Sequence, residues 1–190
     1  AVQMPASAIR KLVPLADAAK KQGTKVYHLN IGQPDIKSPK CALDAIKNFS
    51  LENVSYSHSA GLMDLRKGLV EKYYKKIGID ITVDELIVTV AGSESVNLAL
   101  EIACNPGDEV IVLEPFYTNY NTFAFMNGIT LKSISTDIRD GFQVPSMDEF
   151  EKAITDRTKA ILVCNPGNPT GTLYSKESML ALGDIARRHD

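Results

Sequence analysis

Along most of this chain, hydrophobic positions form either short apolar runs typical of strands or amphipathic segments with the period of a helix. The changes from one pattern to the other predict the elements. Apolar runs rich in β-branched residues predict short strands at residues 26–31, 86–90, 109–113, 129–134 and 159–162. Amphipathic segments predict helices at residues 7–22, 39–48, 61–78, 93–104, 117–127, 146–154 and 175–188. From about residue 80 onward, strands alternate with helices. This alternation predicts an α/β fold, with a mostly parallel sheet and helices on both of its faces.

The segment before residue 80 does not follow this alternation. We therefore expect part of it to belong to a different, smaller domain or to an oligomer contact. The last predicted helix ends where the next parallel strand would begin, at His189-Asp190. We expect the large sheet to be incomplete at this C-terminal end.

The most informative segment joins the last predicted strand to the last predicted helix. It contains two Asn-Pro steps, Asn165-Pro166 and Asn168-Pro169, and two glycines. Proline lacks an N–H and restricts the residue before it, so the backbone can neither continue as a strand nor enter a helix. Such a loop can hold an asparagine amide at the carboxyl end of a strand, where open α/β sheets bind ligands. The alternative is a turn that binds nothing.

The turn Gly92-Ser93-Glu94 has the pattern of an anion site, because it leads from a predicted strand directly into a helix. The first N–H groups of a helix have no partner within it, and the helix dipole favours negative charge there. Gly92 lets the backbone approach a phosphate, and Ser93 can offer a hydroxyl. The pattern is neither a dinucleotide fingerprint nor a P-loop. The alternative is a tight turn with a serine cap.

Aromatic residues follow the next predicted strand, at Phe116, Tyr117 and Tyr120. They could stack on a flat heterocycle, or they could simply cover the local core. Taken together, three strand ends offer an anion cradle, an aromatic surface and a rigid asparagine. Pyridoxal phosphate, a phosphorylated planar ring that bears oxygen, would use all three.

Composition removes several other classes of function. Of the 190 residues, 44% are hydrophobic and 23% charged, and the net charge of −2 gives no reason to expect nucleic acid or an anionic membrane as a partner. No apolar run reaches the ~18 residues that a membrane span needs. The three widely spaced cysteines indicate a reducing compartment, so we expect a cytoplasmic protein. The three histidines lack the spacing of ligands, and we predict no metal site.

Four segments resemble the class I/II aminotransferases that depend on pyridoxal phosphate, the aspartate aminotransferase superfamily. The Asn-Pro-Gly-Asn-Pro-Thr-Gly loop is the most specific of them. The next most specific is the spacing of Tyr56, Gly61 and the pair Leu65-Arg66. The resemblance runs from residue 4 to the end of the chain. The four segments are Met4–Arg10, Asn30–Asp35, Tyr56–Arg66 and Asn165–Gly171.

The resemblance implies roles for particular residues. Asn168 would donate its amide to the ring oxygen of the cofactor and help to keep that oxygen anionic, whereas Asn165 would be structural. Tyr117 would stack on the pyridine ring. Backbone N–H groups of Gly92, Ser93 and Glu94, with the Ser93 hydroxyl, would hold the phosphate.

The resemblance also implies contacts and domains outside the loops that follow the strands. Tyr56 would reach the phosphate in the neighbouring subunit of a homodimer, and Gly32 would lie against the substrate. Residues 1–45 would form an N-terminal arm and contribute to a small domain. Residues 46–190 would be the N-terminal part of the large cofactor-binding domain, truncated before the catalytic lysine.

Some residues of the family's site have no counterpart in this sequence. The lysine that forms the Schiff base with the cofactor lies in a Ser-x-Ser-Lys motif that is absent here. The aspartate that pairs with the pyridine nitrogen and the arginine that binds the substrate carboxylate are absent as well. We therefore assign no catalytic residue in this chain, and we predict that these 190 residues alone do not transaminate.

The resemblance implies an N-terminal fragment of an aminotransferase, which would transfer an amino group from an L-amino acid to a 2-oxo acid. Two alternatives remain open. One is another enzyme of the same superfamily, either a lyase or an aminocyclopropane-carboxylate-synthase-like enzyme. The other is a non-catalytic domain that keeps the fold and binds the cofactor.

Overall fold

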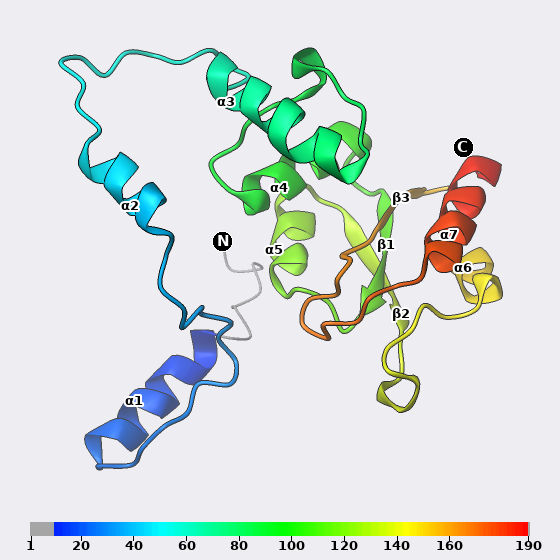
Figure 1. Cartoon of the computed structure of the whole chain (residues 1–190). Coiled ribbons are helices and arrows are strands. Elements are labelled where there is room, and N and C mark those ends of the chain that lie inside the picture. The colour runs from blue at the N-terminus through cyan, green and yellow to red at the C-terminus, as the bar shows by residue number, and fades with distance from the viewer. Residues whose placement is uncertain (1–9, 190) are drawn as a thin grey trace. The chain divides into compact units, whose positions relative to one another are not determined.

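The computed structural model, drawn in Figure 1, describes residues 10–189. Their contacts divide the chain into two compact units. The first, which we call the sheet unit, combines the segment up to Val26 with the segment from Ser95 onward. The second, which we call the helical unit, is Tyr27–Glu94. The predicted domain boundary at residues 45 and 46 is a different division and stays a prediction.

The sheet unit contains a parallel sheet, as the alternation of strands and helices predicted. Its strands are β1 (Glu109–Glu114), β2 (Thr130–Ser135) and β3 (Thr158–Leu162), in the order β2-β1-β3. Strand β1 lies between the other two and pairs in parallel with both. All three strands therefore end at the same edge of the sheet.

The helices of the sheet unit begin and end close to the predicted positions. They are α1 (Val13–Lys21), α5 (Asn119–Met126), α6 (Met147–Ala153), α7 (Lys176–Arg188) and α4 (Gly92–Ala103), whose first three residues belong to the helical unit. Two short 3₁₀ helices lie at Arg10–Leu12 and Ile138–Asp140. The predicted start of the first helix, at residues 7–9, lies outside the described residues.

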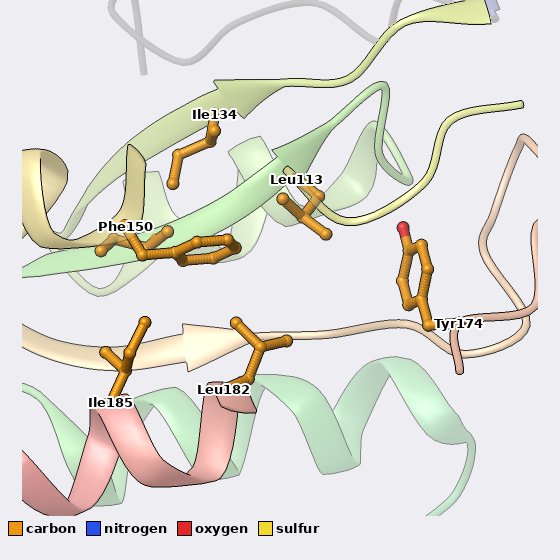
Figure 2. Packing of buried hydrophobic residues seen from close by; sticks show 7 residues of the cluster. Leu113, Ile134, Phe150, Tyr174, Leu182 and Ile185 are labelled. Atoms are coloured by element: carbon orange, nitrogen blue, oxygen red, sulfur yellow. The ribbon is translucent and has the colours of Figure 1, made fainter. Parts of the chain in front are cut away.

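Strand β1 is buried on both faces, which explains why its sequence is apolar without interruption. Ile111 and Leu113 pack in one cluster, whereas Val110 and Val112 pack in another, because successive side chains of a strand point to opposite faces. The first cluster lies under α6 and α7, and Figure 2 shows Phe150 of α6 among its members. The second cluster lies under α4 and α5. Helices thus cover both faces of the sheet, as predicted.

The helical unit contains two predicted helices, one of which is irregular. Helix α2 is Lys40–Lys47. Helix α3, Met63–Leu69, continues as a π-helical turn and then as a 3₁₀ turn up to Ile77. It ends at Gly78, whose φ of 79° is the left-handed conformation that glycine adopts without strain. A short 3₁₀ helix follows at Val83–Glu85.

Two predicted strands, at residues 26–31 and 86–90, are wrong. Neither segment forms a strand in the structure. The second is extended at Leu86, and its Val88 N–H donates to the Ala60 carbonyl at 3.0 Å, but within residues 10–189 it is paired with no neighbouring strand. A strand needs a ladder of hydrogen bonds to a partner, and one bond does not make a ladder. Apolar β-branched composition indicated the extended backbone but not the pairing.

A buried carboxylate, Glu109, lies at the start of β1. Its side chain accepts hydrogen bonds from Thr155 at 2.6 Å and from Arg157 at 2.7 Å, and it pairs with Lys132 at 3.4 Å. The hydrogen bonds from Thr155 and Arg157, together with the charge of Lys132, lower the pKa of Glu109 to about 2. The network joins β1 to β2 and to the turn that precedes β3.

Glu109 is therefore expected to make the stability of the fold depend on pH. Because folding lowers this pKa, the charged carboxylate stabilises the fold above the ordinary glutamate pKa of about 4.3. That contribution is lost as the pH falls toward the folded value of about 2. Glu109→Gln should lower the urea midpoint at pH 7 and flatten its fall between about pH 5 and pH 2. Glu149→Gln, which removes an exposed pair with Lys152, is the control. Equal pH profiles for the two variants would contradict this role.

Candidate functional site

The loops that follow the three strands are tied to one another at the carboxyl edge of the sheet. Both the backbone N–H and the hydroxyl of Thr136, after β2, donate to the Glu114 carbonyl at the end of β1, each at 2.8 Å. The Thr172 hydroxyl, in the loop after β3, donates to the Gly141 carbonyl at 2.8 Å. This edge is the place where open α/β sheets bind ligands.

The loop from Asn165 to Thr172 is closed on itself by short backbone bonds. The Gly167 N–H donates to the Thr172 carbonyl and the Gly171 N–H donates to the Gly167 carbonyl, both at 2.8 Å. A Cβ at Gly167 would lie 2.6 Å from the Thr170 hydroxyl, and Gly171 has a φ of 73°. Both positions therefore need glycine. The Asn-Pro bonds at Asn165 and Asn168 are cis.

The two asparagines of this loop have different surroundings. The Asn165 side chain accepts a hydrogen bond from the Tyr174 backbone N–H at 3.0 Å, which is a structural contact. Asn168 is exposed, and within residues 10–189 no hydrogen bond holds its amide. Asn168 therefore has its donor free at the carboxyl edge of the sheet, whereas Asn165 fixes the loop.

A small pocket lies between the loop after β1 and the loop after β3. We call it the strand-end pocket, and we define it by Phe116, Tyr120, Cys164, Asn168 and Tyr174. Its enclosed volume is about 10 Å³, which is about the space that one water molecule needs. A ligand larger than water would therefore lie against the open side of the pocket, where Asn168 is exposed.

The aromatic residues after β1 form a stack in which Tyr120 is central. The Tyr120 ring lies nearly parallel to that of Phe116, with centroids 6.1 Å apart, and it meets Tyr117 edge to face at 5.6 Å. Tyr117, which was predicted to stack on a ligand, is half-buried, and its hydroxyl accepts a hydrogen bond from the Asn119 amide at 2.6 Å. Tyr117 lies beside the residues of the strand-end pocket and does not line it.

The sequence named Tyr120 among the aromatic residues after β1 but gave it no role of its own, and it did not indicate Cys164 as a member of this site. Tyr120 is 8% exposed, and burial, followed by the neighbouring Cys164, raises its pKa to about 12. The pKa of Tyr174 is also raised, first by burial and then by Cys164. The Cys164 thiol donates to the Pro166 carbonyl at 3.3 Å. The signal for Tyr120 was its place in the aromatic segment that follows β1, and nothing comparable marked Cys164.

The predicted anion cradle lies at the start of α4, in the helical unit. Gly92 is the first residue of this helix, and a Cβ there would have no atom within 4 Å. Ser93 and Glu94 are exposed, and the Glu94 carboxylate accepts the Val90 backbone N–H at 2.6 Å. Glu94 therefore uses its carboxylate to cap the turn, and only its backbone belongs to the predicted cradle.

The two other predicted site residues also belong to the helical unit. Tyr56 is fully exposed, with a relative accessibility of 105%. Gly32 lies in an irregular segment with open space where a side chain would be. Their proposed contacts, with a neighbouring subunit and with substrate, stay predictions.

The described residues show neither a cluster of metal ligands nor a helix that could span a membrane. Within residues 10–189, no three side chains of His, Cys, Asp or Glu gather closely enough to hold a metal ion. None of the helices in the same residues has the length and apolar character that a membrane crossing requires.

Fold and site together define an α/β protein with a free asparagine amide and an aromatic cluster at the carboxyl edge of a parallel sheet. The family model described as aminotransferase class I and II matches residues 24–190. The chain belongs to the class I and II aminotransferase family.

Individual relatives agree with this membership. The chain is 36% identical over 172 residues to the aspartate/prephenate aminotransferase of Thermus thermophilus, covering 90% of this chain and 44% of that protein. It is 34% identical over 170 residues to the (5-formylfuran-3-yl)methyl phosphate transaminase of Methanocaldococcus jannaschii, covering 89% of this chain and 44% of that one. The alanine aminotransferase structure from Pyrococcus furiosus matches with a TM-score of 0.88 and 37% identity, covering 99% of this chain and 48% of that one. The chain thus spans about half the length of the relatives that it matches.

Proposed function

We propose that this chain is part of an aminotransferase that depends on pyridoxal phosphate. The reaction would move an amino group from an L-amino acid to a 2-oxo acid. The observation that carries the proposal is the exposed amide of Asn168, which no hydrogen bond within residues 10–189 holds, on a closed loop at the end of β3. Family membership supports it, because the family model covers residues 24–190.

Two sets of residues fit different parts of this cofactor. The Asn168 amide can donate a hydrogen bond to an anionic ring oxygen, and an aromatic cluster lies next to it. The start of α4 at Gly92 and Ser93 can offer N–H groups and the positive end of a helix dipole to a phosphate. Bound pyridoxal phosphate would supply the electron sink for amino transfer, while the protein orients it.

The substrate class is proposed as amino acids and 2-oxo acids, without a preferred member. The relatives' names differ in substrate, from aspartate and prephenate to a furan phosphate. Membership of the family therefore does not indicate which of these substrates the protein uses. We place Gly32 against the substrate and Tyr117 against the cofactor ring as part of the same proposal.

We further propose a cytoplasmic homodimer in which Tyr56 serves the site of the neighbouring subunit. Tyr56 is fully exposed within its own chain, which leaves its hydroxyl available to another. The three cysteines of this chain are all free, which suits a reducing compartment. In this proposal, residues 1–45 form the arm and small-domain contribution, and residues 46–190 belong to the large domain.

The test of this function uses the full-length protein with added pyridoxal phosphate. We expect saturable cofactor binding by absorbance, and amino transfer when L-aspartate, L-alanine and aromatic L-amino acids are each offered with 2-oxoglutarate. Product amino acids and 2-oxo acids are measured by mass spectrometry. Cofactor binding without any amino transfer, but with elimination products, would move the assignment to a lyase. Absence of both binding and transfer would overturn the proposal.

The 190 residues by themselves are expected to be inactive in the same assay. The sequence lacks the Ser-x-Ser-Lys motif that carries the family's catalytic lysine. Borohydride reduction in the presence of pyridoxal phosphate, followed by peptide mapping, should label surface lysines weakly and at no single site. A stoichiometric adduct on one lysine, such as Lys132 or Lys159, would contradict this prediction.

A further inference from the structure

The strand-end pocket contains a buried aromatic side chain to which the proposed reaction gives no role. Tyr120 is the second residue of α5, and its backbone N–H donates to the Tyr117 carbonyl at 3.0 Å. Two residues of α5, Tyr120 and Ala124, are buried, and Ala124 packs against the core under β1. Because α5 packs against the core through Ala124, it fixes the position of the Tyr120 backbone.

Tyr120 contacts the loops that follow two different strands. On the β1 side, its ring stacks on Phe116 and meets the edge of Tyr117. On the β3 side, it lines the strand-end pocket together with Cys164 and Asn168. The enclosed space that remains is only about 10 Å³, so the rings and the thiol nearly fill the volume between the two loops.

We propose that Tyr120 is a positioning residue that sets the spacing between the aromatic loop 115–118 and the asparagine loop 163–171. Its ring keeps the two loops a fixed distance apart, and this fixes the direction in which the Asn168 amide faces the bound cofactor. This inference rests on the proposed function. Interiors are close-packed, and a missing ring at this position lets both loops move into the space it leaves.

The hydroxyl of Tyr120 has a smaller part in this role than the ring. It is neutral at pH 7, as an ordinary tyrosine is, and burial and the adjacent Cys164 raise the pKa of Tyr120 further, to about 12. The neighbouring polar group in the pocket is the Cys164 thiol, and thiols make only weak hydrogen bonds. We therefore expect Tyr120→Phe to keep the spacing and Tyr120→Leu to lose it.

The first measurement needs no cofactor. In the full-length protein, alkylation of Cys164 by N-ethylmaleimide is followed by mass spectrometry of the peptide that contains it. Tyr120→Leu should raise the rate of Cys164 alkylation by about tenfold. This corresponds to a decrease of about 1.4 kcal/mol in the free energy needed to open the pocket. Tyr120→Phe should stay within about twofold of the unchanged protein. Phe150→Leu is the matched control, because Phe150 is a fully buried aromatic residue of the cluster under α6 and α7.

The second measurement separates positioning from general stability. In the loaded protein, the pKa read from the cofactor absorbance should rise in Tyr120→Leu and stay unchanged in Tyr120→Phe and Phe150→Leu. A loss of stability alone would not move this value. If Tyr120→Leu and Phe150→Leu give equal alkylation rates or equal cofactor pKa values, the role of Tyr120 is overturned. If the unchanged protein binds no pyridoxal phosphate, the proposed function itself fails. The alkylation rates, which need no cofactor, then still show whether Tyr120 keeps the two loops apart.

Discussion

Asn168→Ala is expected to raise the pKa read from the absorbance of bound pyridoxal phosphate by about 1–2 units. A hydrogen bond to a charged group contributes about 1.5–3 kcal/mol, and one pKa unit corresponds to about 1.4 kcal/mol. Asn168 would donate to the anionic ring oxygen, so losing its amide destabilises the anionic form and makes protonation easier. The sign is therefore upward. The measurement is a spectroscopic pH titration of the loaded full-length protein.

The control for this prediction is an asparagine that is bonded within the same unit but away from the strand ends. The Asn127 amide donates to Asn97 at 3.0 Å and to the Phe123 carbonyl at 2.9 Å. Asn127→Ala should therefore lower stability without changing the cofactor pKa. An unchanged titration in Asn168→Ala would remove Asn168 from the site.

Phe150→Ala is expected to lower the free energy of unfolding by about 3–5 kcal/mol. Phe150 is fully buried and lies between α6 and the sheet, and Figure 2 shows its ring among Leu113, Ile134 and Ile185. Truncation would remove buried apolar surface and leave a cavity that close-packed neighbours fill only in part. Typical domains are stable by about 5–15 kcal/mol, so this loss is a large share of the total.

The matched control is a phenylalanine on the outer side of α5. Phe125 is 41% exposed, so Phe125→Ala should cost much less than Phe150→Ala. Urea unfolding of the full-length protein, followed by tyrosine fluorescence, gives the midpoints of both variants. Similar midpoints would show that the cluster under α6 and α7 contributes little to stability.

The sheet unit could be predicted from sequence because local pattern and tertiary role agree there. Strand β1 is apolar at Val110, Ile111, Val112 and Leu113, and the structure buries all four between helices on both faces. The start of α7 was also predicted, and the Ser175 hydroxyl accepts the Ser178 N–H at its first turn. In both cases the residues that set the local conformation are neighbours in the chain.

The segment at residues 86–90 shows where this reasoning stops. Its composition is that of a buried strand, yet Ile87 is 65% exposed and Val90 is 93% exposed. Side chains determine that a segment prefers an extended backbone, but a strand exists only when another segment supplies its hydrogen bonds. Whether such a partner exists depends on the tertiary structure, and the sequence of residues 86–90 alone does not indicate it.

The candidate site divides in the same way. The asparagine loop was predicted because proline restricts the backbone around it, which is a local restriction, and the resemblance to the family then pointed to Asn168. The contact between Tyr120 and Cys164 was not predicted, because the two residues lie far apart in the sequence and meet only when the loops after β1 and β3 come together. Nothing in the sequence near either residue indicates the other.

The sequence by itself therefore determined the parallel α/β class, the proline-restricted asparagine loop and the resemblance to an aminotransferase. These features follow from backbone restrictions and from periodicities that act over a few residues. Only the tertiary structure decided which aromatic ring fills the space beside Asn168, which carboxylate is held ionised at the start of β1, and which apolar segments become strands. Each of these depends on packing and hydrogen bonding between segments that are distant in the chain.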